Sequence, residues 1–376
     1  MPNVFSIFLR QYLLLTALLV VGCEHNTPPP KTLSVAELLG GTPAAGFKTA
    51  NEIIPFQFPR DHGPHPEFRN EWWYITGNLH TAEGRKFGFQ VTFFRVALTP
   101  PSKALALNSN WNQHTLWMAH IALTDVDEGQ HYAAEKLSRG DPGMAGATGS
   151  PLKVWLDDWQ LVSSEGDFPW RISVNGEDFG LQLFVEPIKP MVLQGEQGLS
   201  RKSATPGNAS YYYSYPRMRS RGALHVKGTQ YSVSGLSWFD REWSTSALDD
   251  KQIGWDWFSL QLHDGSELMY YQIRNRDGST HKNSQGKWIN PEGKSTTISA
   301  SDIQLEPQAV WQSADGRNYP TQWALEDKRG HHWTIIAPVK EQLMNTTVQY
   351  WEGTVDVVDQ ETQQIIGRGY LEMTGY

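Results

Sequence analysis

Residues 71–95 read EWWYITGNLHTAEGRKFGFQVTFFR, an aromatic segment and a second apolar segment joined by an acidic residue and a glycine. Glu83-Gly84 separates two runs rich in aromatic and β-branched residues, which is typical of a β-hairpin. The first run opens with Trp72-Trp73-Tyr74-Ile75, and the second ends at Arg95. We therefore predict a long antiparallel hairpin at this point of the chain.

Residues 255–274 repeat this design. Their sequence, WDWFSLQLHDGSELMYYQIR, again places an aromatic run before an acidic-glycine turn, Asp264-Gly265, and ends at Arg274. Two hairpins of one design in the two halves of the chain predict a duplicated barrel, with the boundary near residues 219–222. The alternative is that aromatic hairpins recur in β proteins without duplication.

The rest of the folded body also has the pattern of strands and turns. β-branched and aromatic runs alternate with turn signals, and no stretch after residue 50 shows convincing helical periodicity. This pattern predicts an all-β fold of barrels or sandwiches, with one domain over residues 51–220 and a second over residues 221–376. The clearest strands are expected at Thr115–Thr124, Leu181–Glu186, Gln252–Leu262, Leu268–Arg274 and Val348–Val358.

Residues 1–22 have the composition of a secretory signal peptide. One charge, Arg10, precedes an apolar run at residues 12–21 that is too short for a stable membrane span. Residues 20–23, Val-Val-Gly-Cys, resemble a bacterial lipobox, and Cys23 is the only cysteine, so an internal disulfide is excluded. We predict that Cys23 is lipidated and anchors the protein to a membrane.

Residues 23–50 contain three consecutive prolines and many small residues, which indicates a flexible tether. Glu24, in the position after the cysteine, indicates sorting to the outer membrane by analogy with Gram-negative lipoproteins. The expected location is therefore the bacterial cell envelope, at the periplasmic face of the outer membrane. The formal charge of the chain is −8, and such an acidic surface argues against nucleic acid as a partner.

The chain has 16 tryptophans, and seven of them stand with carboxylates in four short strings. An indole N–H and a carboxylate each need a polar partner when they leave water. Together they predict a cavity lined by aromatic faces with acid groups among them. The alternative is an aromatic barrel core whose acids point to solvent. The four strings are residues 71–74, 238–243, 254–257 and 350–353.

Several motifs resemble those of the AttH and carotenoid 1,2-hydratase (CrtC-like) family, whose members are also called secreted hydrolases. The similarity covers roughly residues 56–376 and implies two lipocalin-like antiparallel β-barrels packed together, with a site in or between them. It also implies that related members bind or act on extended apolar polyene or polyketide-like molecules. The motifs are EWWYITG at residues 71–77, GLSWFDREW at 235–243, GWDW at 254–257, YWEG at 350–353 and GYLEMTGY at 369–376.

One departure from the family pattern concerns the chemistry. The carotenoid hydratases have a histidine before the aspartate of the central motif, where this chain has Phe239 before Asp240. They also have an aspartate after a later tyrosine, and the counterpart here, near residues 270–272, holds no acid. Hydration of an alkene needs a positioned acid and a base that activates water. The resemblance therefore predicts the fold and the ligand class more firmly than the reaction.

Asp240, Glu242 and Asp256 are the candidate catalytic acids and bases. On an extended strand, Asp240 and Glu242 project to one face, whereas Arg241 and Trp243 project to the other. Two neighbouring carboxylates walled by tryptophan would raise one pKa and provide an acid and a base near neutral pH. The alternative is a structural network in which Arg241 pairs with the carboxylates at the seam between the barrels.

His120 is a further catalytic candidate. Alternation places it with Met118 and Ala122 on one face of a strand, where it could carry protons inside a barrel. The alternative is a structural histidine that is hydrogen-bonded in the core. Glu71 has the same two interpretations, as an acid in a barrel lumen or as a partner of Arg95.

Aromatic residues near these acids are the candidate ligand contacts. Residues 211–217 hold four tyrosines that could roof a pocket, and their hydroxyl groups could orient the polar end of an apolar ligand. The alternative is a connector that packs between the barrels. The candidate ligand-binding residues are Glu71, Trp73, Tyr213, Trp238, Trp243, Trp255, Trp257 and Tyr271.

The sequence indicates no metal and no cofactor. His62 and His65 with Asp61 have suitable residue types but lie in a glycine- and proline-rich loop, and the adjacent His331 and His332 would face opposite ways on a strand. Nucleophile-elbow, zinc-protease and phosphate-loop motifs are absent from the sequence.

These observations favour a lipid-anchored envelope protein that binds an extended apolar molecule, such as a lipid, isoprenoid or polyene, in a pocket lined by tryptophan and carboxylate. The first alternative is an enzyme in the same pocket, a hydro-lyase, isomerase or hydrolase that uses the carboxylates. Glycan binding is a further alternative, because tryptophan faces also stack on sugars. The last is a lipoprotein that assembles with an envelope transporter.

Overall fold

The computed structural model describes residues 33–34, 45–106, 114–139, 143–163, 166–246 and 248–376. The predicted signal peptide, Cys23 and most of the predicted tether lie outside these residues. The described part is almost entirely antiparallel β-structure, as predicted, with a short 3₁₀ helix, η1 (Arg60–His62), and one α-helix, α3 (Pro101–Ala106). No helix in this part is long and apolar enough to cross a membrane.

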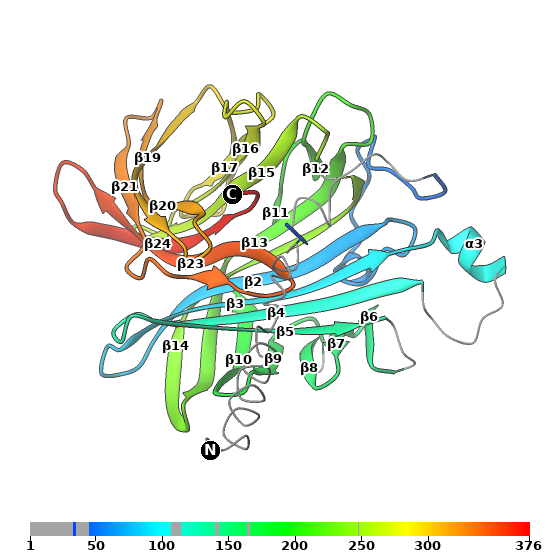
Figure 1. Ribbon diagram of the computed structural model, residues 1–376, viewed down its shortest axis with the longest axis horizontal. Helices are drawn as coiled ribbons and strands as arrows, with labels where there is room; N and C mark the ends of the chain where they lie inside the picture. The colour runs from blue at the N-terminus through cyan, green and yellow to red at the C-terminus, as the bar shows by residue number, and fades with distance from the viewer. Residues whose placement is uncertain (1–32, 35–44, 107–113, 140–142, 164–165, 247) are drawn as a thin grey trace, which may run out of the picture. The chain divides into compact units, whose positions relative to one another are not determined.

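The first half of the body forms a curled sheet of 13 strands within the described residues, here called the N-terminal barrel (Figure 1). Two of these strands are short, β11 (Val192–Leu193) and β12 (Leu199–Arg201), and both pair with β13. The other strands follow one another in the sheet as β5 (Gln130–Ser138), β4 (Thr115–Asp125), β3 (Lys86–Ala97), β2 (Asn70–His80), β14 (Thr229–Ser246), β13 (Ala209–Val226), β10 (Phe179–Pro187), β9 (Trp170–Asn175), β8 (Trp159–Ser163), β7 (Leu152–Leu156) and β6 (Ala145–Gly149).

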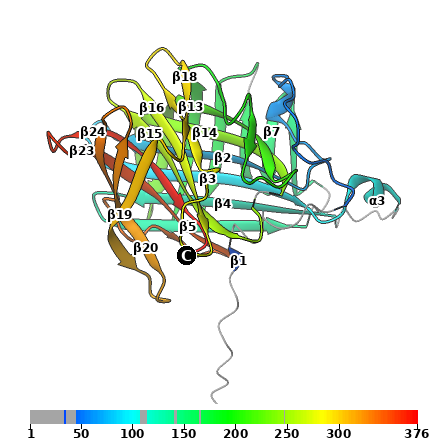
Figure 2. The ribbon, with the colours of Figure 1, turned by 90° about the horizontal axis from the view of Figure 1, so that it is seen from above.

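The second half forms another curled sheet, of 11 strands among the described residues, here called the C-terminal barrel (Figure 2). Two short strands, β1 (Leu33–Ser34) and β22 (Leu343–Met344), pair with β23. The remaining strands follow in the order β18 (Ser295–Ser299), β17 (Gln285–Ile289), β16 (Glu267–Asn275), β15 (Gln252–Leu262), β24 (Ile365–Met373), β23 (Val348–Asp359), β21 (His332–Ile336), β20 (Asn318–Asp327) and β19 (Ile303–Gln312).

The two hairpins predicted from the repeated sequence design are β2–β3 and β15–β16. They share one more feature, because the arginine that ends each hairpin pairs with a buried carboxylate of the hairpin's first strand. Arg95 pairs with Glu71 in the first, and Arg274 pairs with Asp256 in the second. Each barrel is therefore braced by a buried ion pair at an equivalent hairpin.

The passage from one sheet to the other lies later in the chain than the sequence suggested. The proposed boundary at residues 220/221 falls inside β13, which pairs along its whole length with β14 in the N-terminal barrel. Apart from the short strand β1, the second sheet begins with β15, after Ser246. Strands β13 and β14 form one long hairpin that turns at Lys227 and Gly228, both with positive φ. Gly222 lies inside this hairpin, where a Cβ atom would lie 2.1 Å from O of Gln182 on β10.

Each barrel has a filled interior. The N-terminal core includes Trp73, Trp170 and Trp243, and the C-terminal core includes Trp323 and Trp351. All five side chains are fully buried. The expectation that aromatic residues pack a barrel core therefore holds for these tryptophans, and neither of these clusters is the predicted hollow.

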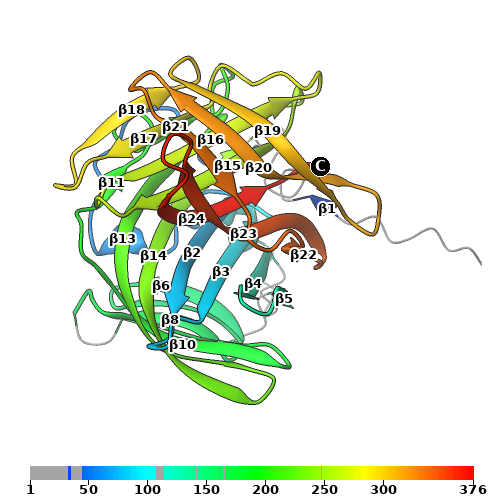
Figure 3. The same ribbon diagram turned by 90° about the vertical axis from the view of Figure 1, so that its left-hand side faces the viewer.

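A third apolar region, here called the seam, lies where the outer faces of the two barrels meet. Strands β2, β3, β13 and β14 contribute from one side, and β15, β16, β23 and β24 from the other. Figure 3 shows β23 and β24 lying against β2 and β3. The approach is close, because a Cβ atom placed on Gly88 of β3 would lie 2.7 Å from Cβ of Thr354 on β23.

Candidate functional site

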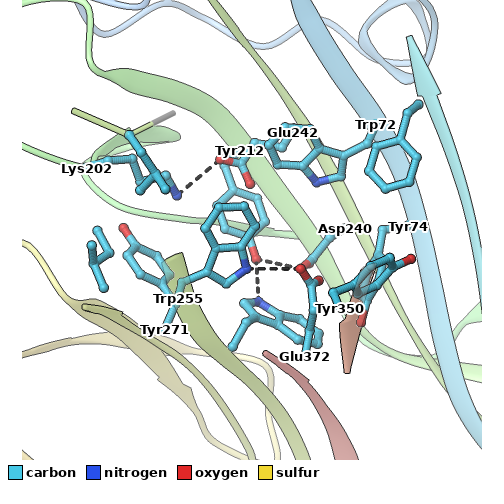
Figure 4. A pocket seen from close by; sticks show the side chains of 14 residues that line it. Trp72, Tyr74, Lys202, Tyr212, Asp240, Glu242, Trp255, Tyr271, Tyr350 and Glu372 are labelled. Carbon is cyan, nitrogen blue, oxygen red and sulfur yellow. Dashed lines mark hydrogen bonds and ion pairs between the residues drawn. The ribbon is translucent and has the colours of Figure 1, made fainter. Parts of the chain in front are cut away.

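The seam encloses a pocket between the two barrels (Figure 4). The space open to the centres of water molecules is about 60 Å³, and all empty space among the lining atoms, including the mouth, is about 680 Å³. The wall is mainly aromatic, with four ionisable side chains of Lys, Asp and Glu set into it. The lining residues are Trp72, Tyr74, Phe94, Lys202, Tyr212, Asp240, Glu242, Leu248, Trp255, Trp257, Tyr271, Ile273, Tyr350 and Glu372.

Strand alternation decides which residues of β14 reach the pocket. Asp240 and Glu242 share the face that opens on the seam, as predicted. Phe239 and Trp243, on the opposite face, pack in the core of the N-terminal barrel. One strand thus supplies both the barrel interior and the acid groups of the pocket.

Asp240 is held by three hydrogen-bond donors. The Tyr212 hydroxyl donates to Oδ2 at 2.5 Å, and the Trp238 indole Nε1–H donates to Oδ1 at 2.7 Å. The Ser214 hydroxyl also donates to Oδ1. Removal from water raises the pKa of Asp240 to about 7 even though these donors favour the ionised form. Asp240 can therefore exchange a proton near neutral pH.

Glu372 approaches the pocket from β24, in the other barrel. The indole Nε1–H of Trp255 donates to its Oε1 at 3.1 Å. Burial, and then the negative charges of Asp240 and Glu242, raise the pKa of Glu372 to about 8. At pH 7 this group retains its proton, whereas Asp240 is close to half ionised.

Tyr212 joins the two sides of the pocket. Its hydroxyl group accepts a hydrogen bond of 3.1 Å from the Trp257 indole of the C-terminal barrel and donates to Asp240 of the N-terminal barrel. The oxygen atom of Tyr212 therefore depends on both barrels for its position. Burial raises the pKa of this phenol well above its ordinary value, so Tyr212 stays protonated and remains a donor.

Lys202 and Glu242 form an ion pair in the pocket wall. Nζ of Lys202 lies 3.1 Å from Oε1 of Glu242 and 3.1 Å from Oγ of Ser200. The ammonium group also lies 4.1 Å from the centre of the Tyr271 ring and 5.3 Å from that of Tyr212. Burial lowers the pKa of Lys202, but the interactions with Glu242 and Tyr271 together outweigh burial, and the pKa is raised.

Predicted residues fall into two groups in the structure. Asp240, Glu242, Trp255, Trp257 and Tyr271 line the pocket. Trp238 lies directly behind the wall, in the seam, and donates to Asp240. These residues come from both barrels, and the predicted convergence of tryptophan and carboxylate is found here.

Four other predicted ligand contacts do not line this pocket. Trp73, Tyr213 and Trp243 pack inside the N-terminal barrel, because they stand one position away from the seam-facing residues of their strands. Glu71 is buried on the same side, where it pairs with Arg95 and Arg241. The charge of these arginines holds the pKa of Glu71 well below its usual range despite its burial.

Two predicted catalytic residues are also placed elsewhere. Asp256 points away from the pocket and binds Arg274 and, at 2.8 Å, the hydroxyl group of Tyr376. His120 shares the face of Met118 and Ala122, as alternation predicted, but this face lies in the seam and not inside a barrel. There its Nδ1 is 2.8 Å from the hydroxyl group of Tyr350. Tyr350 lines the pocket, so His120 can act on a ligand only through Tyr350.

The candidate residues missed from the sequence are Tyr212, Lys202 and Glu372. Tyr212 lies in the tyrosine-rich segment 211–217 and Glu372 in the closing motif 369–376, and alternation from Asp240 and Trp257 across the paired strands would identify both. Lys202 has no such signal, since it follows a three-residue strand and reaches the pocket through the tertiary fold.

The structure brings no metal-binding cluster together in the part of the chain that it describes. His62 is 2.6 Å from the Tyr213 hydroxyl group, and His65 stacks on Trp243 with 3.8 Å between ring centres. Both side chains are therefore used in packing the N-terminal barrel.

A family model and several solved structures match this chain. The sequence model of one family, described as AttH-like, matches residues 49–376. The chain belongs to the AttH-like family. The crystal structure of an AttH protein from Nitrosomonas europaea is 36% identical, with a TM-score of 0.76 over 86% of this chain and 99% of that one. These findings confirm the resemblance that the motifs indicated. No curated protein matches the sequence of this chain.

Two further solved structures share the fold of this AttH-like protein. Kievitone hydratase from Nectria haematococca is 13% identical, with a TM-score of 0.65 over 88% of this chain and 96% of its own. CghA, solved with Sch210972, is 12% identical, with a TM-score of 0.55 over 91% of this chain and 97% of its own. At these identities the similarity is one of fold, and it confirms the pair of barrel-like domains.

Proposed function

We propose that this AttH-like protein is an acid–base enzyme that adds water to, or removes it from, a small, largely apolar unsaturated molecule bound in the seam pocket. One observation carries the proposal. Asp240 and Glu372, supplied by different barrels, line one aromatic pocket, and their pKa values lie near 7 and 8. A base and an acid that both exchange protons near neutral pH are the requirements of such a reaction.

The wall of the pocket suits an apolar ligand. Trp72, Tyr74, Trp255, Trp257 and Tyr350 offer aromatic faces, and burial of apolar area contributes about 25 cal/mol per Å². Aromatic faces also stabilise positive charge that develops on a carbon skeleton. The hydratase activity in the name of the kievitone enzyme agrees with this reaction class, although that enzyme shares only 13% of its sequence with this chain.

Protonated Glu372 gives its proton to one carbon of a double bond, and the π electrons of that bond form the new C–H bond. A water molecule attacks the other carbon and gives a proton to the Asp240 carboxylate, which leaves a hydroxyl group on the product. The proton on Asp240 then returns to Glu372 through the pocket, and the reverse sequence is a dehydration.

Carotenoid hydratases have a histidine where this chain has Phe239, and this difference does not remove Asp240 or Glu372 from the pocket. Phe239 lies on the barrel-core face of β14, where it packs 4.9 Å, ring centre to ring centre, from Trp170. Asp240, its neighbour, faces the pocket. The histidine that carotenoid hydratases have at the position of Phe239 therefore has no counterpart in this pocket, and Glu372 takes the role of acid here.

Binding without turnover is the second candidate function, and the aromatic wall of the pocket favours it. Trp238 and Trp257 are buried rather than displayed on an open face, which supports an apolar ligand over a glycan. Deuterium transfer separates the two candidates. The ligand that copurifies with the protein would be extracted, identified by mass spectrometry and returned to the apo protein in D₂O.

An enzyme will place deuterium on a carbon of the ligand, and a binder will return it unlabelled. Asp240→Asn and Glu372→Gln should abolish labelling while binding is kept. Glu186→Gln serves as the control, since Glu186 is an exposed β10 carboxylate paired with Arg219. Labelling that persists in both pocket variants would contradict the assignment of acid and base.

We also propose that lipidated Cys23 holds the pocket near a membrane, where apolar molecules concentrate. The lipobox-like sequence at residues 20–23 supports this proposal. The wild-type protein should incorporate labelled palmitate and fractionate with outer membranes. Cys23→Ser should do neither, and a soluble, unlabelled wild-type protein would contradict the proposal.

A further inference from the structure

His120, buried in the seam, lies between the pocket wall and a carboxylate that reaches solvent. Its Nδ1 is 2.8 Å from the hydroxyl group of Tyr350, which lines the pocket. The other ring nitrogen, Nε2, is 3.7 Å from Oε2 of Glu135, whose side chain is 25% exposed. Glu135, His120 and Tyr350 therefore form a line of titratable groups from solvent to the pocket, here called the relay.

Strand pairing fixes the position of the relay. His120 on β4 stands opposite Glu135 on β5, so the two side chains share the outer face of the N-terminal barrel. This face lies against β22 and β23 of the other barrel (Figure 3). Thr347, just before β23, holds Glu135 because its main-chain N–H and its hydroxyl group each donate to Oε1 at 2.8 Å. The relay therefore crosses the contact between the barrels.

The facing atoms of His120 and Glu135 are the open link of the relay. At 3.7 Å they are beyond hydrogen-bond distance, and both are buried with no hydrogen-bond partner in the described part of the chain. A buried polar atom without a partner is costly, and a small closing movement would join these two. Burial raises the pKa of Glu135, but the contacts with His120 and Thr347 outweigh burial, and the pKa is lowered. The solvent end of the relay is therefore an ionised carboxylate.

The other two members have protonation states that suit proton transfer. Burial lowers the pKa of His120 and outweighs the interaction with Glu135, so the ring is neutral at pH 7 and has one N–H and one nitrogen lone pair. Burial, and then the negative charges of Glu352 and Glu372, raise the pKa of Tyr350 well above its ordinary value. Tyr350 therefore keeps its proton, and each group can accept one proton while it releases another.

The proposed reaction creates a need for such a path, because it leaves Glu372 ionised. Return of a proton from Asp240 across the pocket requires water there. The space open to water is about 60 Å³, so a bound product displaces that water. Tyr350 and Glu372 lie on the neighbouring strands β23 and β24 and line the same pocket (Figure 4).

Resting on the proposed function, we infer that protons pass between solvent and Glu372 along the relay, which a bound product leaves open. Glu135 takes up a solvent proton and gives it to Nε2 of His120. Nδ1 of His120 gives its proton to the Tyr350 oxygen as the Tyr350 hydroxyl proton moves to the Glu372 carboxylate. His120 is left with its hydrogen on Nε2, and the same moves in reverse carry a proton outward.

Hydrogen–deuterium exchange at the Glu372 carboxyl group tests the relay without a substrate. The full-length protein at pH 7 would be mixed rapidly with D₂O. Infrared spectroscopy would then follow the carbonyl band of protonated Glu372, which is identified by its loss in Glu372→Gln. Exchange should slow by about 100-fold when any relay member is replaced, because a positioned proton carrier contributes at least about that factor. The variants are Glu135→Gln, His120→Phe and Tyr350→Phe.

His131→Phe is the matched control, since His131 is a histidine of β5 that bonds Thr124 at 2.9 Å and does not line the pocket. Its exchange rate should equal that of the wild type. Tyr350→Phe keeps the ring and removes only the hydroxyl group, so it tests the relay even if the His120 variant does not fold.

Wild-type exchange rates in all the relay variants would overturn the inference and leave the proposed function intact, since protons would then enter through the mouth of the pocket. A wild-type protein that shows no band of protonated Glu372 at pH 7 would count against the proposed function itself and against the inference that rests on it.

Discussion

The hydroxyl group of Tyr212 on β13 donates a 2.5 Å hydrogen bond to Asp240 on the neighbouring strand β14, and the same oxygen accepts from Trp257 of the other barrel. The ionisation of Asp240 therefore depends on how the two barrels meet. When Asp240 is protonated it can donate to the Tyr212 oxygen, which frees the phenol proton to point into the pocket. This pair of hydrogen bonds exists only when both barrels are docked.

The pH dependence of turnover should be a narrow bell. Activity requires ionised Asp240, so it should rise with pH through about 7, and it requires protonated Glu372, so it should fall above about 8. Because the two carboxyl groups interact, the apparent pKa of each limb describes the pair and not one residue. Glu372→Gln should abolish turnover. Any activity that this variant keeps should not fall above about pH 8, because the alkaline limb depends on Glu372. A flat profile from pH 5 to 10 would exclude both groups.

The indole donors should shift the two limbs separately. Trp255→Phe removes a hydrogen bond that lowers the pKa of Glu372, so the alkaline limb should move to higher pH. Trp238→Phe removes a hydrogen bond that lowers the pKa of Asp240, so the acid limb should move to higher pH. Rate profiles of both variants check this, and each variant is the control for the other. Identical shifts of both limbs in either variant would contradict the assignment.

Asp240→Asn should stabilise the protein at neutral and alkaline pH. Burial raises the folded-state pKa of Asp240 from 3.8 to about 7, so its ionisation costs nothing below pH 3.8 and weakens the fold progressively up to about pH 7. The variant avoids this cost, which is at most about 4 kcal/mol at 1.36 kcal/mol per pKa unit. Urea unfolding at pH 4 and pH 8 would measure it. If the wild type becomes more stable relative to Asp240→Asn between pH 4 and pH 8, Asp240 is not a buried aspartic acid with a raised pKa.

Glu71→Gln should weaken the N-terminal barrel and leave the ligand site unchanged. Glu71 pairs with Arg95 and Arg241, and removal of one partner from a buried ion pair costs about 3–5 kcal/mol. Because the folded-state pKa of Glu71 is lowered, its contribution is present above the unfolded pKa and is lost as pH falls. Denaturation at pH 7 tests the stability, and ligand affinity of the folded protein should match the wild type. Normal stability with weakened binding would place Glu71 in the site after all.

Gly88→Ala should disturb the contact between the barrels. The added Cβ would lie 2.7 Å from Cβ of Thr354, and such overpacking typically costs about 1–3 kcal/mol. We expect weaker ligand binding together with faster proteolysis between residues 246 and 252, where the chain passes from one sheet to the other. Thr354→Gly added to this variant should restore part of the affinity. Unchanged affinity in Gly88→Ala would show that the pocket does not depend on this contact.

The sequence predicted the hairpins and the pairing of Asp240 with Glu242 on one face, because strand alternation is a local property. It could not tell which face of β2, β13 or β14 meets the other barrel. These strands are buried on both faces near the seam, so hydrophobic alternation does not distinguish the two sides. The sequence therefore predicts Tyr213 as a ligand contact, whereas the structure places Tyr212 in the pocket and Tyr213 in the barrel core. Lys202 depends on tertiary contacts that no local pattern records.

Alternate residues of β14 face two different environments. Phe239 and Trp243 pack in a barrel interior, and Asp240 and Glu242 face the pocket. A lineage can therefore change the molecule it handles by substitutions at every second position while the intervening positions preserve folding. Divergence of this kind would leave proteins with one architecture, little sequence in common and unrelated small-molecule chemistries.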